Sequence, residues 1–422
     1  MSKYSFGIEE EYFLVDQRTG GVKTRLSEKF MKSAGRELGS HLMTELLQSQ
    51  IEVATSPLTC PREARAKLKT FRSTLAAIGR EHRIAIMAAG THPLCRPAQQ
   101  RVTNKRRYAK MINELGMIAL GNAICGLHVH VEVPDPDQRV GIMHRLVPFL
   151  PLLLALTTSS PFWACSETGL LGYRNAANDG FPRSGFPEMF RSSAEYEAYL
   201  EALVSANIIP DATYIWWAVR PSLRHPTLEL RLTDSCTSIN DAIAVAGLYR
   251  ALVKHLVEHP EVNREYSALV RGLSEENRWR AQRYGTDGTY VDVRTREAKP
   301  FATLLDETLA HVSRDLDALG LTPEVEQLRE IPMRGTSAHQ QLRHYHELRK
   351  KGHSRVSALQ AVVRWLCIST EAGDFVEPTF LSRAQGRSAV VEVALSKLAH
   401  SSGCDANSEQ QRSNGTGGAI CA

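Results

Sequence analysis

The stretch from Phe6 to Val15 places three consecutive acids inside an apolar segment, and few folds can bury such a sequence. Tyr12–Val15 is typical of a buried strand. If the strand includes the acids, alternation points Glu9 and Glu11 to one face and Glu10 to the other. Two carboxylates on one face repel each other unless a cation lies between them. The segment alone leaves two interpretations open, a solvent-facing strand end and a cation site.

Three further segments alternate polar and apolar residues, as half-buried strands do. Their polar faces carry Gln48, Gln50 and Glu52, then His128, His130 and Glu132, and finally Glu229 and Arg231. Carboxylates with an occasional imidazole suit Mg²⁺ or Mn²⁺, and the missing sulfur argues against zinc-thiolate chemistry. The four strands predict a sheet with one face on a helical core. Its other face forms a metal cradle of Glu9, Glu11, Glu52, His128, His130 and Glu229.

Helical spacing of apolar residues covers much of the remaining chain. The predicted helices span Pro61–Arg83, 104–118, 138–156, 193–206 and 239–258, and the chain is mostly helical from there to Ile368. Shorter strands are predicted at Ile84–Ala89 and Thr213–Val219. The segment Ser159–Pro187, rich in glycine and proline, is long for a loop, and loops of that length are usually functional or disordered.

The composition excludes several classes of protein. The 422 residues carry a net charge of +5, and no run of Lys and Arg predicts a nucleic-acid partner. Eight scattered cysteines without a C-x-x-C pair favour reduced thiols in a cytoplasm. The apolar run Leu146–Leu156 is shorter than the ~18 residues of a membrane span, and the N-terminus lacks the apolar core of a signal peptide. We therefore expect a cytoplasmic protein without a membrane partner.

The length is compatible with two or three domains or with one large one, and we expect a single catalytic domain over residues 1–385, followed by a tail over residues 386–422. The tail holds one predicted helix, Ser388–Ala399. From Ser401 onward it is rich in Ser, Asn and Gly, a composition typical of disorder. The tail is therefore expected to contribute little to the catalytic domain.

Glycine motifs that bind phosphate, G-x-x-x-x-G-K-[ST] and G-x-G-x-x-G, are absent from the chain. A bound nucleotide would then depend on metal ions and arginines, whose planar fork fits carboxylate and phosphate groups. Arg174, Arg183, Arg220 and Arg231 are the candidates, because they lie beside aromatic residues, prolines or the acidic strands. For each of them a salt bridge within the protein is the alternative.

Seven segments together resemble the glutamate–cysteine ligase type 2 family of carboxylate–amine ligases. The resemblance extends over residues 4 to 370, and the segments occur in the family's order. They are Phe6–Glu11, Gln50–Thr55, Cys125–Val131, Thr168–Arg174, Trp217–Ser222, Thr227–Leu232 with Asp234, and Glu276–Ala281. Gly172 departs from the pattern, since a small hydroxyl residue is expected there, and the tail after Ser401 matches nothing in the family.

The resemblance implies an α+β fold like the catalytic domain of glutamine synthetase, in which a curved, mainly antiparallel sheet holds ATP and Mg²⁺ (or Mn²⁺) with helices on its outer side. It also implies that the family's metal ligands correspond to Glu9, Glu11, Glu52, His128 and Glu229, with His130 as a further candidate. It also implies that Arg231 contacts phosphate or substrate. Arg174 and Arg220 are the other expected catalytic arginines, and Arg220 and Arg231 are expected to bind the nucleotide.

The implied reaction has two steps: ATP phosphorylates a substrate carboxylate, and an amine attacks the acyl phosphate. Amino-acid substrates are expected, with glutamate and cysteine as the default pair and weak glutamate–cysteine ligase activity as one outcome. A homodimer is left open. Two alternatives also remain: a metal-dependent hydrolase that uses His128, His130 and Glu52, and a non-catalytic nucleotide-binding protein.

Overall fold

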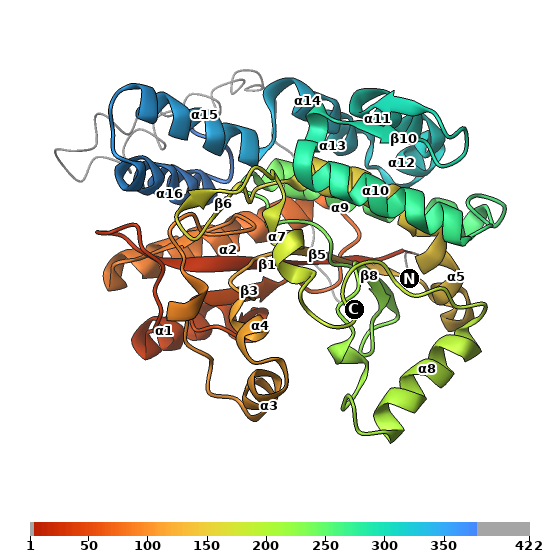
Figure 1. Cartoon of the computed structure of the whole chain (residues 1–422), viewed down its shortest axis with the longest axis horizontal. Coiled ribbons are helices and arrows are strands. Elements are labelled where there is room, and N and C mark those ends of the chain that lie inside the picture. The colour runs from red at the N-terminus through yellow and green to blue at the C-terminus, as the bar shows by residue number, and fades with distance from the viewer. Residues whose placement is uncertain (1–3, 378–422) are drawn as a thin grey trace, which may run out of the picture. The chain divides into compact units, whose positions relative to one another are not determined.

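The central sheet joins strands that lie far apart in the sequence. In the computed structural model, which describes residues 4–377, the order is β2-β3-β1-β5-β9-β8, with β4 pairing the far end of β1. All pairings are antiparallel, in agreement with the expected sheet. The strands are β1 (Phe6–Asp16), β2 (Leu42–Thr44), β3 (Gln50–Ala54), β4 (Ile84–Met87), β5 (Leu127–Glu132), β8 (Val219–Pro221) and β9 (Thr227–Leu230). Figure 1 shows them crossing the middle of the described region.

Helices α2 (Pro61–His82) and α9 (Ile239–Glu258) pack against the sheet and against each other. Both were predicted from helical spacing. Almost every side chain of α9 is buried, so it is a core helix rather than a surface one. Ser238 caps the start of α9, since its Oγ accepts a hydrogen bond from the Asp241 amide at 3.4 Å. The apolar face of the sheet packs against these helices, and its polar face forms the site.

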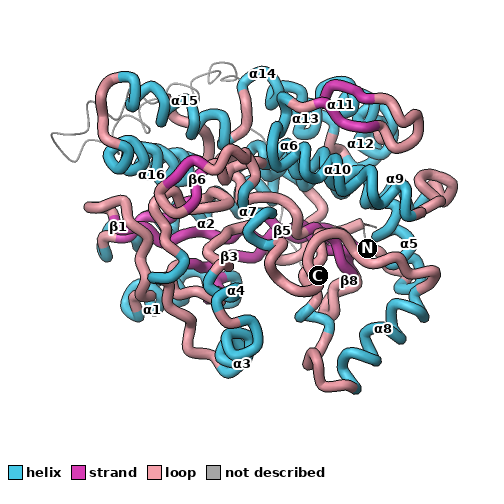
Figure 2. Tube along the Cα trace, viewed as in Figure 1, coloured by secondary structure: helices cyan, strands magenta, loops and turns pink. Residues whose placement is uncertain are grey.

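The remaining helices surround this core. Figure 1 places α10, α15 and α16 on one side of the strands and α3 and α8 on the other, and Figure 2 shows the loops that connect them. Their bounds are α1 (Glu28–Leu38), α3 (Arg106–Leu115), α4 (Met117–Leu120), α5 (Pro136–Leu146), α6 (Leu150–Thr157), α7 (Tyr173–Asn178), α8 (Ser193–Ser205), α10 (Ala268–Tyr284), α11 (Phe301–His311), α12 (Ser313–Leu319), α13 (Thr322–Glu326), α14 (Ile331–Arg334), α15 (Ser337–Lys350) and α16 (Arg355–Ala372). Two hairpins complete the structure, β6 (Phe162–Trp163) with β7 (Ser166–Glu167) and β10 (Thr289–Val291) with β11 (Ala298–Pro300).

The predicted apolar helix near residues 138–156 is interrupted. A 3-10 turn, Val147–Phe149, separates α5 from α6, because Pro148 and Pro151 cannot donate the backbone hydrogen bonds of a continuous helix. The stretch Pro136–Thr157 is long and apolar enough to cross a membrane, but 78% of its most apolar window is buried inside the protein. That burial is typical of a core helix.

The strand predicted at Thr213–Val219 is wrong for most of its length. A 3-10 helix covers Ala212–Tyr214, and only Val219 belongs to a strand. The backbone between them bonds to a loop instead: the Trp216 amide donates to the Arg183 carbonyl at 2.9 Å. Tertiary packing of this aromatic segment has outweighed its strand propensity. The expected helix Ser388–Ala399 and the tail beyond it lie outside the described residues.

Candidate active site on the polar face of the sheet

The polar side chains of neighbouring strands lie opposite one another and form a continuous row. Glu11 pairs with Glu52 across β1 and β3, and Glu9 pairs with His128 across β1 and β5. The row continues as His130 pairs with Glu229 across β5 and β9. Side chains opposite each other in an antiparallel pair are close enough to interact. The strands therefore bring together all six predicted metal ligands.

Glu9 is the centre of this row. Its carboxylate lies 3.3 Å from His128 Nδ1 and 3.2 Å from His130 Nε2. Burial works to raise the pKa of Glu9, but the hydrogen bonds from the two histidines outweigh it and lower that pKa below its ordinary value. The same contact with Glu9, together with the charge of Glu229, overcomes burial and raises the pKa of His130. Glu9 is thus held as a carboxylate at neutral pH.

A second group consists of acids alone. Glu11, Glu45 and Glu52 each place a carboxylate oxygen within 4.8 Å of the others. Burial, and then the charges of Glu9, Glu45 and Glu11, raise the pKa of Glu52 well above its ordinary value. Burial likewise raises the pKa of Glu11 and of Glu45. A divalent cation would relieve this repulsion, and oxygen ligands suit Mg²⁺ or Mn²⁺.

Glu229 is held between two arginines. Arg220 Nε donates to Glu229 Oε2 at 2.8 Å, and the Arg231 guanidinium donates to the other oxygen. Burial would raise the pKa of Glu229, but Arg231 and Arg220 together lower it well below its ordinary value. The ligand atoms of Glu9, His130 and Glu229 also lie within 4.8 Å of one another. Glu229 can therefore share a cation with Glu9 and His130 while it orients both arginines.

Arg174 enters the site from α7, and its side chain is buried. Its Nη1 donates to the Arg231 and Leu232 carbonyls at 3.2 Å each. Its Nε is buried and has no hydrogen-bond partner among the described residues. A Cβ atom at Gly126 would lie only 2.4 Å from Arg174 Nη2, so the glycine is what allows the guanidinium to approach the sheet.

These residues line one cavity of about 540 Å³. All nine predicted site residues contribute to it: Glu9, Glu11, Glu52, His128, His130, Arg174, Arg220, Glu229 and Arg231. Arg183 does not, because its guanidinium lies 5.4 Å from the Trp216 ring centroid and donates to the Tyr214 carbonyl. The cavity also includes residues that sequence patterns did not indicate: Glu45, Arg107, Tyr108, Arg224 and His225. They lie in helices or irregular segments, where no alternation marks a face.

Glu10 points to the opposite face, as alternation predicts. It is fully buried, and Arg72 Nη2 donates to its Oε1 at 2.6 Å. The same Arg72 nitrogen donates to the Cys236 carbonyl at 2.7 Å, and the Tyr12 hydroxyl donates to Glu10. This ion pair joins β1, α2 and the segment before α9. Sequence patterns gave no reason to pair Glu10 with Arg72.

Comparison with known proteins finds relatives that match most of the chain. The profile described as "Glutamate-cysteine ligase family 2(GCS2)" matches residues 5–359. A protein of Bradyrhizobium sp. (strain ORS 278) named "Putative glutamate--cysteine ligase 2" is 43% identical over 372 residues, which cover 88% of each chain. A protein of the same name from Rhodospirillum rubrum is 43% identical over 373 residues, covering 87% of this chain and 96% of its own.

Solved structures share the fold at low sequence identity. A glutamate–cysteine ligase from Francisella tularensis in complex with AMP superposes with a TM-score of 0.64 at 13% identity, over 95% of this chain and 93% of its own. A bifunctional glutathione synthetase from Pasteurella multocida gives a TM-score of 0.62 at 15% identity, over 87% of this chain and 53% of its own. The predicted α+β class is thereby confirmed. The chain belongs to glutamate–cysteine ligase family 2, and the predicted enzyme class, an ATP-dependent carboxylate–amine ligase, is confirmed.

Proposed function

We propose that the polar face of the sheet is the ligase active site and that glutamate and cysteine are its default substrates. The observation that carries the proposal is the row from Glu52 to Glu229, which ends at two arginines within one cavity. Acids and histidines at one end suit cations, whereas guanidinium groups at the other suit phosphate and carboxylate. An enzyme that transfers a phosphoryl group from ATP to a carboxylate needs both.

The donor set fits divalent metal ions, Mg²⁺ or Mn²⁺. Glu11, Glu45 and Glu52 would hold one ion, and Glu9, His130 and Glu229 would contribute to another, while His128 groups with Glu9 and Glu52. Buried like charges favour such ions, and His128 Nε2 has no hydrogen-bond partner among the described residues. When bound, the ions would neutralise phosphate charge during transfer.

The three arginines have different roles in the proposal. Arg220 already donates to Glu229 with Nε and Nη2 and to the Ile215 carbonyl with Nη1, so it mainly positions Glu229. The Arg231 guanidinium donates only to Glu229 among the described residues, which leaves further N–H groups for the phosphates of ATP. Arg174, with its unpaired Nε, would bind the substrate carboxylate or the phosphoryl group it receives.

The substrates react in two steps. The substrate carboxylate attacks the γ-phosphorus of ATP and ADP leaves, and the amine then attacks the acyl phosphate, which releases phosphate and forms the amide. Fixed guanidinium groups stabilise the charge that develops on the transferred phosphoryl group. The proposal places this reaction in the cytoplasm, where the cysteines that the structure shows as free thiols, such as Cys95 and Cys125, stay reduced.

Release of ADP, measured over a panel of acid and amine pairs with Mg²⁺, tests the proposal. The expected result is ADP release that requires both an acid and an amine, with one amide formed per ADP. Glutamate with cysteine is the first pair to measure. Phosphate release that is independent of the amine would instead support the hydrolase alternative and would contradict the proposal.

A further inference from the structure

We propose that the chain carries a second metal site, for a transition-metal ion such as Zn²⁺, at the ends of α9 and α11. Three histidines gather there: His255 in the last turn of α9, His259 directly after that helix, and His311 at the end of α11. His255 Nε2 lies 3.0 Å from His311 Nε2. The ring centroids of His255 and His259 lie 4.4 Å apart. None of these residues belongs to the polar face of the sheet.

A buried carboxylate fixes the orientation of His255. Asp315 Oδ2 lies 2.8 Å from His255 Nδ1, and both side chains are buried. Lys254 Nζ donates to the other Asp315 oxygen at 2.7 Å and balances its charge. When Nδ1–H donates to the carboxylate, the lone pair of Nε2 is directed away from it, toward His311. A carboxylate behind the imidazole is the usual arrangement for a histidine that binds a metal.

The distance between the two Nε2 atoms also fits a shared ion. Zn–N bonds of about 2.0–2.1 Å in tetrahedral geometry place two nitrogens about 3.3 Å apart, slightly more than the distance observed. Without an ion, one proton must lie between the atoms as an N–H···N hydrogen bond, and a metal ion would replace that proton. Nitrogen ligands favour Zn²⁺, Co²⁺, Ni²⁺ or Cu²⁺ over Mg²⁺.

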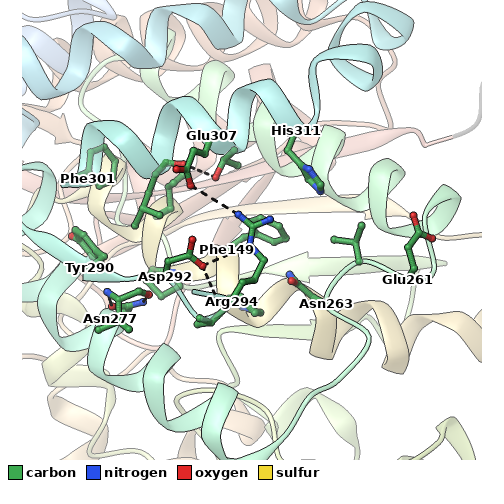
Figure 3. A pocket seen from close by; sticks show the side chains of 18 residues that line it. Phe149, Glu261, Asn263, Asn277, Tyr290, Asp292, Arg294, Phe301, Glu307 and His311 are labelled. Carbon is green, nitrogen blue, oxygen red and sulfur yellow. Dashed lines mark hydrogen bonds and ion pairs between the residues drawn. The ribbon is translucent and has the colours of Figure 1, made fainter. Parts of the chain in front are cut away.

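Access and helix electrostatics support the site. His259 and His311 are both exposed, so an ion can enter from solvent, and the ring of His259 lies against that of His255. Both helices end here, and their C-terminal carbonyls favour positive charge. Figure 3 shows His311 at the end of α11, beside Glu307 on the wall of a cavity of about 320 Å³. Solvent water would complete the coordination of an ion held by His255 and His311.

Bound zinc, measured by equilibrium dialysis of the full chain in excess Mg²⁺, tests the site. We expect His255→Asn and His311→Asn each to lower bound zinc by one equivalent per chain. Asp315→Asn should retain the ligands but weaken zinc binding by about 10–100-fold. Zinc should also raise the unfolding temperature of the wild type, since an ion that binds only the folded state stabilises it, but not that of His311→Asn.

His346→Asn is the matched control, because His346 is an exposed histidine whose Nε2 lies 3.5 Å from Glu167, away from this cluster. It should leave bound zinc unchanged. His311→Asn alters only an exposed side chain, so this variant tests the zinc site even where His255→Asn fails to fold. Zinc that is unaffected by His311→Asn, or lowered equally by His346→Asn, would overturn the proposal.

Discussion

Glu10 lies between two acids of the candidate active site, yet its side chain enters the core and pairs with Arg72. Glu10→Gln removes one charge of a fully buried ion pair and leaves the arginine uncompensated. We expect a loss of about 3–5 kcal/mol in the free energy of unfolding, with a much smaller effect on ATP turnover per folded molecule. Urea denaturation measures the loss. An unchanged unfolding midpoint would show that the pair does not stabilise the fold.

Substitution of Glu9 or Glu11 should have the opposite effect: it should lower ATP turnover and leave the fold intact. Glu9→Gln and Glu11→Gln are expected to lower the rate of ADP production by about 10²-fold or more, because each removes a ligand for the metal ions that would stabilise the charge of the transition state. The fold should persist, as judged by circular dichroism. Glu10→Gln, which makes the same chemical change on the other face of the strand, is the control. An active Glu9→Gln beside an inactive, folded Glu10→Gln would contradict the assignment of the faces.

Glu52 gives a prediction about stability and pH. Burial and three neighbouring carboxylates raise its pKa in the folded state, so ionisation of Glu52 opposes folding. The stability of the metal-free protein should therefore fall as pH rises through that pKa. In EDTA at neutral pH, Glu52→Gln should unfold at a higher temperature than the wild type, and Mg²⁺ should stabilise the variant less. If calorimetry in EDTA finds Glu52→Gln less stable than the wild type, the neighbouring carboxylates do not destabilise the fold by repelling Glu52.

At the scale of elements, the start of β5 depends on Gly126. The glycine leaves room for the side chains of Arg174 and His128. A Cβ atom added at Gly126 would lie 2.9 Å from His128 Nε2. Gly126→Ala should displace both side chains and lower turnover by about 10²-fold, as misplacement near 1 Å can do. Steady-state ADP production measures the effect.

Gly272 is the matched control for this substitution. It lies inside α10, and a Cβ there would have nothing within 4 Å. Gly272→Ala should leave turnover unchanged and stabilise the protein by about 0.5–1 kcal/mol, because alanine favours the helix. Equal losses of activity in the two variants would show that Gly126 has no special part in the site.

Strand alternation was sufficient to predict much of the site. A period of two fixes which side chains share a face, so the grouping of Glu9 with Glu11, and of His128 with His130, could be read directly from the sequence. The helix α2 followed equally well from its period of 3.6. The metal role of these residues stays a prediction.

Other parts of the site and of the fold around it could not be predicted, because they depend on contacts between distant segments. Glu45 lies between two strands and carries no periodic signal, yet it joins Glu11 and Glu52. Arg72 is on an amphipathic helix, where an arginine is normally exposed. The backbone near Trp216 follows a loop from Arg183 rather than its neighbouring strand.

For the whole molecule, we propose that residues 1–385 form the catalytic domain. The composition after Ser401 offers little apolar surface to offset the entropy of ordering. A chain that ends at Ser401 should keep the unfolding temperature and the ADP production of the full chain. Differential scanning calorimetry and the ADP assay measure both, and a large drop in either would show that the tail docks on the domain.

The central claim is that metal ions on the polar face, rather than a glycine loop, secure the nucleotide. Titration calorimetry of ATP into the full chain, in Mg²⁺ and in EDTA, tests it most directly. Six carboxylates line the cavity, those of Glu9, Glu11, Glu45, Glu52, Glu132 and Glu229, and without metal they repel the phosphates. We predict binding in Mg²⁺ and affinity at least about tenfold lower in EDTA, a difference of about 1.4 kcal/mol or more. Equal affinity in the two buffers would contradict the account.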